Sequence, residues 1–120
     1  MARLLFVVTT GPENPTRVTL AFLIARSALQ QGHEVDVFLG GDAVGLLRDD
    51  TLDAVHGVGT GSLRETYQAL ADGGARFHLS RMSSRARALT EADLEGKPAT
   101  LITPDDVVRL TLDAERVLSF

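Results

Sequence analysis

Few side chains in this chain could take part in catalysis. Among them, a serine and a histidine lie close together in the sequence. Ser80 could act as a nucleophile only with a base in reach, and His78 lies two residues before it. In a strand such residues share a face, but they lie about 7 Å apart along the chain. No Gly-x-Ser-x-Gly pattern surrounds any serine. The spacing therefore favours a hydrogen-bonded or solvated serine, and we expect no catalytic residue.

The histidines could also bind a metal. His33 follows a glycine at a helix-to-strand turn, His56 lies in a glycine-rich loop, and His78 lies in a predicted strand. No two of them have the spacing of a metal site. The chain has no cysteine, so disulfides, thiolate metal sites and thiol catalysis are excluded. The sequence predicts no metal site.

The segment 9–16, Thr-Thr-Gly-Pro-Glu-Asn-Pro-Thr, could hold a small anion on free amide groups and hydroxyls before a helix. Two prolines remove donors from it, and Glu13 adds a repelling charge. Both a small-anion site and a purely structural turn remain open. One Tyr and no Trp disfavour a flavin, and no Gly-x-Gly-x-x-Gly supports a dinucleotide. We expect no cofactor.

Three arginines follow Ser80 in a chain that is otherwise acidic. Arg81, Arg85 and Arg87 could line an anion-binding opening or pair with acidic residues of a neighbouring subunit. Exposed arginines of this kind are often merely solvated. All three possibilities stay open.

The elements that must position these residues alternate between strands and helices. We expect strands at 3–9, 34–39, 75–80, 99–102 and 116–120, and helices at about 15–30, 43–48, 63–71 and 103–112. Ser62 and Thr103 have the types and positions of helix N-caps. We expect a loop at 52–61, a loop or short helix at 82–89 and a helical turn at 90–94. This order predicts an α/β fold: five strands, mainly parallel, with helices on both faces.

Composition limits the class of protein. The chain has 120 residues and a net charge of −4, with a pI near 5.2, which argues against binding nucleic acid. One domain over residues 1–120 fits this length. No leader pattern is visible, and the longest apolar run is too short to span a bilayer, so we expect a cytoplasmic protein with no membrane partner.

The first predicted helix is apolar nearly all round. An apolar stripe runs from Val18 to Leu29. The apolar surface of the helix is widened further by Leu20, Leu23 and Ile24. A helix of this kind is buried on two sides. In so short a chain the second side could be another subunit, so we expect a homo-oligomer.

The chain resembles the DsrE/DsrF-like family of small α/β proteins, which includes sulfur-relay subunits. The resemblance covers almost the whole length. It rests on the order and spacing of several loose motifs: residues 3–15, 32–35, 40–44, 74–79, 89–94 and 113–120.

The resemblance implies a flavodoxin-like fold and strand order, and assembly into trimers or hexamers. Sulfur-transferring members carry a persulfide on a cysteine at the end of the third strand. Here Ser80 takes that position, and Ser83 stands where some members have a second cysteine. A persulfide needs a thiolate, which a serine cannot supply. Sulfur transfer by this chain alone is therefore not expected.

Two functions follow as hypotheses. The first is a non-catalytic, oligomeric binding or assembly module with a pocket at the carboxyl ends of the strands. Its ligand would be a small anion or a partner protein, and its expected pocket residues are Thr10, Gly11, Asp42, Ser80 and Arg81. The alternative is an accessory subunit in sulfur relay, whose thiol comes from a partner.

Overall fold

One parallel sheet organises the molecule, which we describe over residues 1–120 from a computed structural model. Its strands lie in the spatial order β6-β5-β2-β1-β7, and all four neighbouring pairs are parallel. The bounds are β1 (Arg3–Val8), β2 (Glu34–Leu39), β5 (Arg76–Ser80), β6 (Ala99–Ile102) and β7 (Arg116–Ser119). The expected α/β fold with five strands is confirmed.

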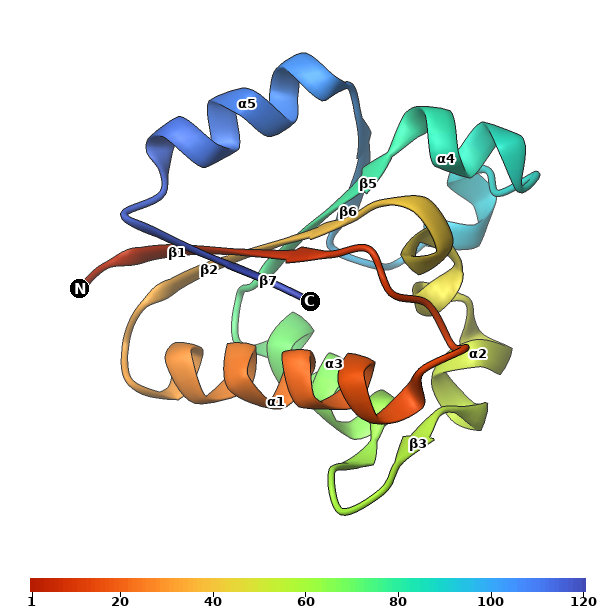
Figure 1. Cartoon of the computed structure of the whole chain (residues 1–120), viewed down its shortest axis with the longest axis horizontal. Coiled ribbons are helices and arrows are strands. Elements are labelled where there is room, and N and C mark those ends of the chain that lie inside the picture. Colours follow the sequence, from red (N-terminus) through yellow and green to blue (C-terminus); the bar gives the residue numbers. More distant parts are fainter.

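Helices lie on both faces of this sheet, as expected. Helices α1 (Pro15–Gln30) and α3 (Leu63–Asp72) lie side by side below it in Figure 1, and α5 (Pro104–Asp113) lies above it. The short α4 (Arg81–Ala86) and the 3₁₀ turn η2 (Glu91–Leu94) connect β5 to β6. None of these helices is long and apolar enough to cross a membrane.

The strand order differs from that of flavodoxin. Numbered along the chain, the five strands lie in the order 4-3-2-1-5, whereas the flavodoxin order is 2-1-3-4-5. Here the steps from β1 to β2 and from β2 to β5 go in one direction, so right-handed crossovers put α1 and α3 on the same face. Only the step to β7 goes back, and it puts α5 on the other face.

The segment between β2 and α3 is more ordered than the sequence indicates. The 3₁₀ helix η1 (Gly41–Leu47) replaces the helix expected at 43–48, and α2 (Asp49–Ala54) follows it. A small hairpin of β3 (His56–Gly57) and β4 (Gly61–Ser62) then leads into α3. The expectation of a loop at 52–61 was wrong because Leu52, which is fully buried, anchors α2 to the core.

Local capping explains where the main helices begin. Asn14 accepts a hydrogen bond from the Arg17 amide, with Pro15 in the first turn of α1. Ser62 caps α3 through the Glu65 amide, and Thr103 forms a capping box with Asp106 at the start of α5. The predicted caps Ser62 and Thr103 are confirmed.

The hydrophobic core lies between the sheet and the α1/α3 layer. Alternate strand residues face it, and the ring of Phe77 of β5 packs at a tilt against the rings of Phe22 and Tyr67. One cluster of 24 buried residues includes these side chains together with Phe6, Val8, Val35, Val37, Leu39 and Leu79. The other strand residues therefore point to the α5 side.

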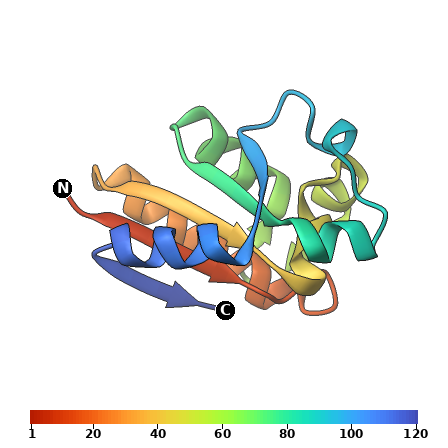
Figure 2. The same ribbon diagram turned by 90° about the horizontal axis from the view of Figure 1, so that it is seen from above.

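The α5 side of the sheet is only partly covered. None of the α5 residues is fully buried. Seen from above, α5 lies over the β1 side of the sheet and leaves β5 and β6 in view (Figure 2). Arg76 on β5 and Thr100 on β6 are accordingly exposed. This open half of the sheet places polar side chains beside the cavity described next.

Candidate functional site

A cavity of about 360 Å³ lies where four of the parallel strands end. Thr9 follows β1, Gly40 and Gly41 follow β2, and Ser80 and Ile102 end β5 and β6. The first turns of α4 and α5 close it, and the remaining lining residues are Phe38, Met82, Ser83, Thr103, Pro104 and Val107. The cavity lies at the carboxyl edge of the sheet, where open α/β sheets bind ligands. It does not lie between β1 and β7, where the strand order reverses.

The walls of this cavity are apolar, with hydroxyl groups between them. The Ser80 hydroxyl accepts a hydrogen bond from the Ser83 amide at 3.2 Å, and the Ser83 hydroxyl accepts one from the Gly41 amide at 3.0 Å. Each of these hydroxyls keeps its own proton to donate. The cavity can therefore surround an apolar group and donate hydrogen bonds to an acceptor on it.

Of the five expected pocket residues, Ser80 alone lines the cavity. Thr9 lines it in place of Thr10, and Gly40 and Gly41 line it in place of Asp42. Gly11 and Asp42 do lie together: a Cβ on Gly11 would come within 2.4 Å of the Asp42 carbonyl oxygen. The Asp42 carboxylate itself pairs with Arg87 at 2.9 Å.

Arg81 lies on another side of α4. Its guanidinium donates to the Leu101 carbonyl oxygen at 3.4 Å. It lines a separate hollow of about 390 Å³, which Ser84, Arg85 and Glu91 also line. The structure thus separates Arg81 from the cavity that Ser80 lines.

The loop before α1 occupies several of its own amide groups. The Glu13 carboxylate accepts a hydrogen bond from the Gly11 amide at 3.1 Å, and the Asn14 side chain accepts one from the Arg17 amide. An anion at this loop would have to displace the Glu13 carboxylate. The geometry therefore favours the structural turn among the two alternatives that the sequence leaves open.

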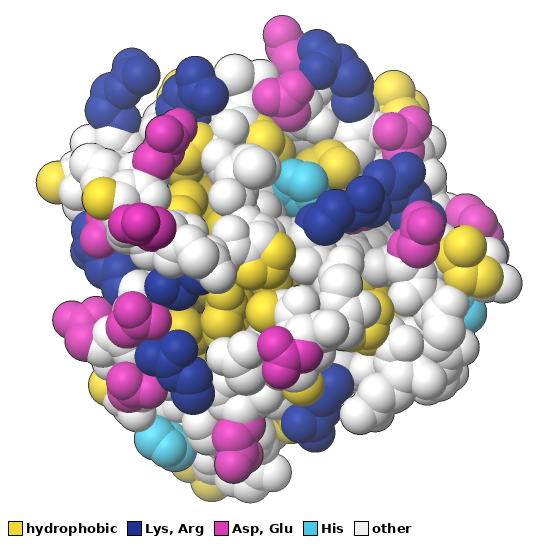
Figure 3. Space-filling view, turned by 180° about the vertical axis from the view of Figure 1, so that it is seen from behind, with side chains coloured by type: hydrophobic (Ala, Val, Ile, Leu, Met, Phe, Trp, Pro, Cys, Tyr) yellow, Lys and Arg dark blue, Asp and Glu magenta, His cyan; other side chains and the backbone are white.

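A buried carboxylate on the α5 side of β2 organises a polar cluster that sequence analysis missed. The Asp36 side chain is 3% exposed and contacts His78 Nε2 at 2.8 Å, Arg76 Nε at 3.1 Å and Arg3 Nε at 3.3 Å. Arg3 also lies 3.9 Å from Glu34. In the space-filling view from behind, a histidine side chain lies against basic side chains (Figure 3). We call Arg3, Asp36, Arg76 and His78 the Asp36 cluster.

Opposing effects act on the pKa of Asp36. Burial raises it, but the hydrogen bonds from His78 and Arg3 and the charge of Arg76 lower it more, so the net pKa lies below its ordinary value. The carboxylate is therefore ionised and accepts the proton on His78 Nε2. This bond fixes the orientation of the imidazole ring.

A pattern in the sequence could have revealed the Asp36 cluster. After Glu34 at its start, the strand 34–39 is apolar except for Asp36, and a charge in its interior needs a partner. Arg76 and His78 alternate with Phe77 and Leu79, and this alternation puts the two polar side chains on one face. What the sequence could not supply is the strand order that makes β5 the neighbour of β2.

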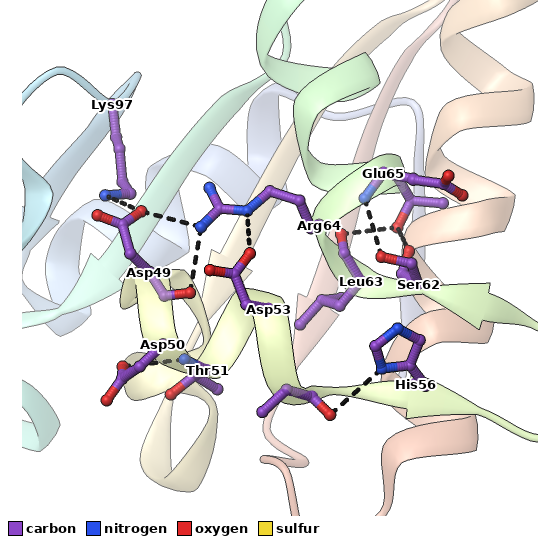
Figure 4. Close-up of polar contacts among 12 residues, drawn as sticks. Asp49, Asp50, Thr51, Asp53, His56, Ser62, Leu63, Arg64, Glu65 and Lys97 are labelled. Carbon is purple, nitrogen blue, oxygen red and sulfur yellow. Dashed lines mark hydrogen bonds and ion pairs between the residues drawn. The ribbon is translucent and has the colours of Figure 1, made fainter.

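A second ion-pair network has a structural role. Asp49 of α2 contacts both Lys97 and Arg64 at 3.2 Å, and Arg64 of α3 also contacts Asp53 at 2.8 Å (Figure 4). The hydrogen bond from Lys97, with help from Arg64, lowers the pKa of Asp49. The network ties α2 to α3 and to the segment before β6. The large surface hollow beside it, about 780 Å³, is lined mainly by charged residues of both signs.

A family model described as the DsrE/DsrF-like family matches residues 2–120. The chain belongs to the DsrE/DsrF-like family. A comparison with curated protein sequences found no match.

Several solved structures share the fold of this DsrE/DsrF-like chain. The ychN protein from E. coli superposes with a TM-score of 0.78 at 17% identity, over 100% of both chains. MTH1491 from Methanobacterium thermoautotrophicum gives 0.76 at 19% identity, also over 100% of both chains. BT1422 from Bacteroides thetaiotaomicron gives 0.74 at 14% identity, over 99% of this chain and 95% of that one.

This DsrE/DsrF-like chain lacks the cysteine that sulfur-transferring members use. Ser80, to which the resemblance assigns that position, ends β5 and lines the cavity. Its hydroxyl caps α4.

Proposed function

We propose that this DsrE/DsrF-like protein is a non-catalytic binding module, and that its ligand enters the cavity at the carboxyl ends of the strands. One observation carries the proposal: apolar walls surround the Ser80 and Ser83 hydroxyls, each of which keeps a proton to donate. Such a lining suits a small, largely apolar group that bears one hydrogen-bond acceptor.

The same contacts argue for binding without catalysis. A serine nucleophile needs a base that takes its proton. The histidine on the same strand face, His78, directs Nε2 to Asp36, and the Ser80 hydroxyl accepts a hydrogen bond from the Ser83 amide. With no cysteine in the chain, a persulfide has no attachment point.

We further propose that the module acts as a homo-oligomer, a trimer or a dimer of trimers. Four apolar side chains on α1, α5 and β7 support this: Leu20 is 42% exposed, Val108 58%, Leu112 78% and Val117 45%. Exposed apolar surface of this kind is typical of subunit interfaces.

Cavity binding can be tested with octanamide, which joins an apolar chain to a carbonyl acceptor. Titration followed by ¹H–¹⁵N NMR should shift the amide signals of Gly41, Ser80 and Ser83. Val107 lines the cavity and Val108 does not, so Val107→Phe should abolish these shifts while Val108→Phe keeps them. No shift in the unmodified protein, or equal shifts in Val107→Phe, would contradict the proposal.

A second candidate function is an accessory role in sulfur relay, with the thiol supplied by a partner protein. The position of Ser80 supports it, because this residue lies at a cavity wall, where an incoming sulfur could be received. Treatment with a persulfide donor should load Ser80→Cys and leave the unmodified chain unloaded. Loading of the unmodified chain would contradict both candidates.

A further inference from the structure

A line of polar side chains leads from the cavity along the open half of the sheet. On β5, Arg76, His78 and Ser80 are alternate residues, and they face away from the buried Phe77 and Leu79. Thr100 of β6 pairs with His78 in register, and its side chain is exposed. We call these four residues (Arg76, His78, Ser80 and Thr100) the β5 track.

Arg76 is built to receive an anion at the far end of this track. Its Nε and Nη2 atoms contact the two Asp36 oxygens at 3.1 and 3.3 Å, which uses one edge of the guanidinium. The Nη1 atom and the outer proton of Nη2 form the second edge, which matches a carboxylate or phosphate. The Arg76 side chain is 51% exposed, whereas Asp36 is 3% exposed, so the cation and not the carboxylate faces a ligand.

The charges around the track balance, two arginines against Asp36 and Glu34, but Arg76 has no carboxylate of its own. Two guanidinium groups contact the single Asp36 carboxylate, and Glu34 forms its ion pair with Arg3 at 3.9 Å. Arg76 therefore shares its only ion-pair partner with a second arginine. The bonds to Asp36 also hold the side chains of Arg76 and His78 in place, which lowers the entropy lost on binding.

We infer that the ligand of the cavity is an amphiphile whose anionic end, a carboxylate or a phosphate, lies on the β5 track within reach of Arg76. This inference rests on the proposed binding function and adds the ligand class. Ser80 and Arg76 are four residues apart on β5, about 13 Å along the strand, so the ligand needs a long carbon chain to extend from Ser80 past His78 to the Arg76 guanidinium.

The monoamide and the diamide of dodecanedioic acid test this inference, because both carry a carbonyl acceptor for the cavity and they differ only in the charge at the far end of the chain. The unmodified protein should bind the monoamide, whose far end is a carboxylate, up to about fivefold more tightly than the diamide, the range for one exposed charge pair. Arg76→Gln should remove the preference. Arg17→Gln removes the same charge from exposed surface of α1, across the sheet, and should keep it.

The outcomes separate this inference from the function on which it rests. Equal binding of the two probes by the unmodified protein, or a preference that persists in Arg76→Gln, would overturn the anionic end and leave the cavity function standing. Binding of neither probe would overturn both. The comparison of probes on the unmodified protein needs no variant, and the NMR spectrum of Arg76→Gln reports directly whether that variant is folded.

Discussion

At the scale of single residues, Asp36 is the carboxylate with the most charged or polar partners. It joins β1, β2 and β5 through Arg3, Arg76 and His78, and its own side chain is 3% exposed. A buried carboxylate is tolerated because these donors occupy both of its oxygens. The cluster therefore stabilises the middle of the sheet and orients the β5 track.

Replacing this carboxylate by an amide should destabilise the fold. Asp36→Asn keeps the shape but removes the charge that faces two guanidinium groups, and we expect the free energy of unfolding to fall by about 1–3 kcal/mol. Urea denaturation at pH 7 measures it. Asp113→Asn, at an exposed position at the end of α5, is the control and should change stability by less than about 0.5 kcal/mol. Equal stability of both variants would show that the cluster contributes nothing.

The contribution of Asp36 to stability should also depend on pH. Because the folded-state pKa of Asp36 is lowered, the ionised carboxylate stabilises the protein fully above its unfolded-state pKa of about 3.9. This contribution is lost as the pH falls through the lower folded-state value. Thermal unfolding between pH 6 and pH 2.5 should thus show a steeper loss for the unmodified protein than for Asp36→Asn. Parallel curves would mean that the pKa of Asp36 is not lowered.

At the scale of elements, the loop between β1 and α1 depends on one glycine. A Cβ on Gly11 would lie 2.4 Å from the Asp42 carbonyl oxygen, which is backbone and cannot turn away. Gly11→Ala should therefore cost about 1–3 kcal/mol of unfolding free energy. Gly45→Ala in η1 meets no atom within 4 Å and should lie within about 0.5 kcal/mol of the unmodified protein. Equal denaturation midpoints for the two variants would contradict the close packing of Gly11 against the Asp42 carbonyl group.

Local patterns predicted most of the elements, and tertiary contacts account for the rest. Apolar periodicity and the caps Ser62 and Thr103 identified the main strands and α1, α3 and α5. The helix α2 was missed because its six residues contain only one buried side chain, Leu52, which gives no helical periodicity. Of the five residues expected to line a pocket at the carboxyl ends of the strands, Ser80 alone lines this cavity, because its apolar walls come from Phe38, Ile102 and Val107 on separate elements.

At the scale of the whole molecule, the exposed apolar residues of α5 predict self-association. Light scattering after size exclusion should give a mass above that of the 12.9 kDa chain at micromolar concentration. Leu112→Gln together with Val108→Thr should lower this mass. Val58→Thr, at the 86% exposed tip of the hairpin, should not change it. A monomer in the unmodified protein would rule out the proposed assembly.

The pairing of β1 with β7 has a consequence for how the chain folds. Leu4 pairs with Arg116, so the outer edge of the first strand is completed by the last strand along the sequence. During synthesis β1 can already pair with β2, but its other edge stays open until β7 has been made. Closing so long a loop is slow, and an open strand edge invites pairing with another chain. The nascent protein thus passes through a stage in which it is prone to aggregate, and protection by a chaperone would help it most at that stage.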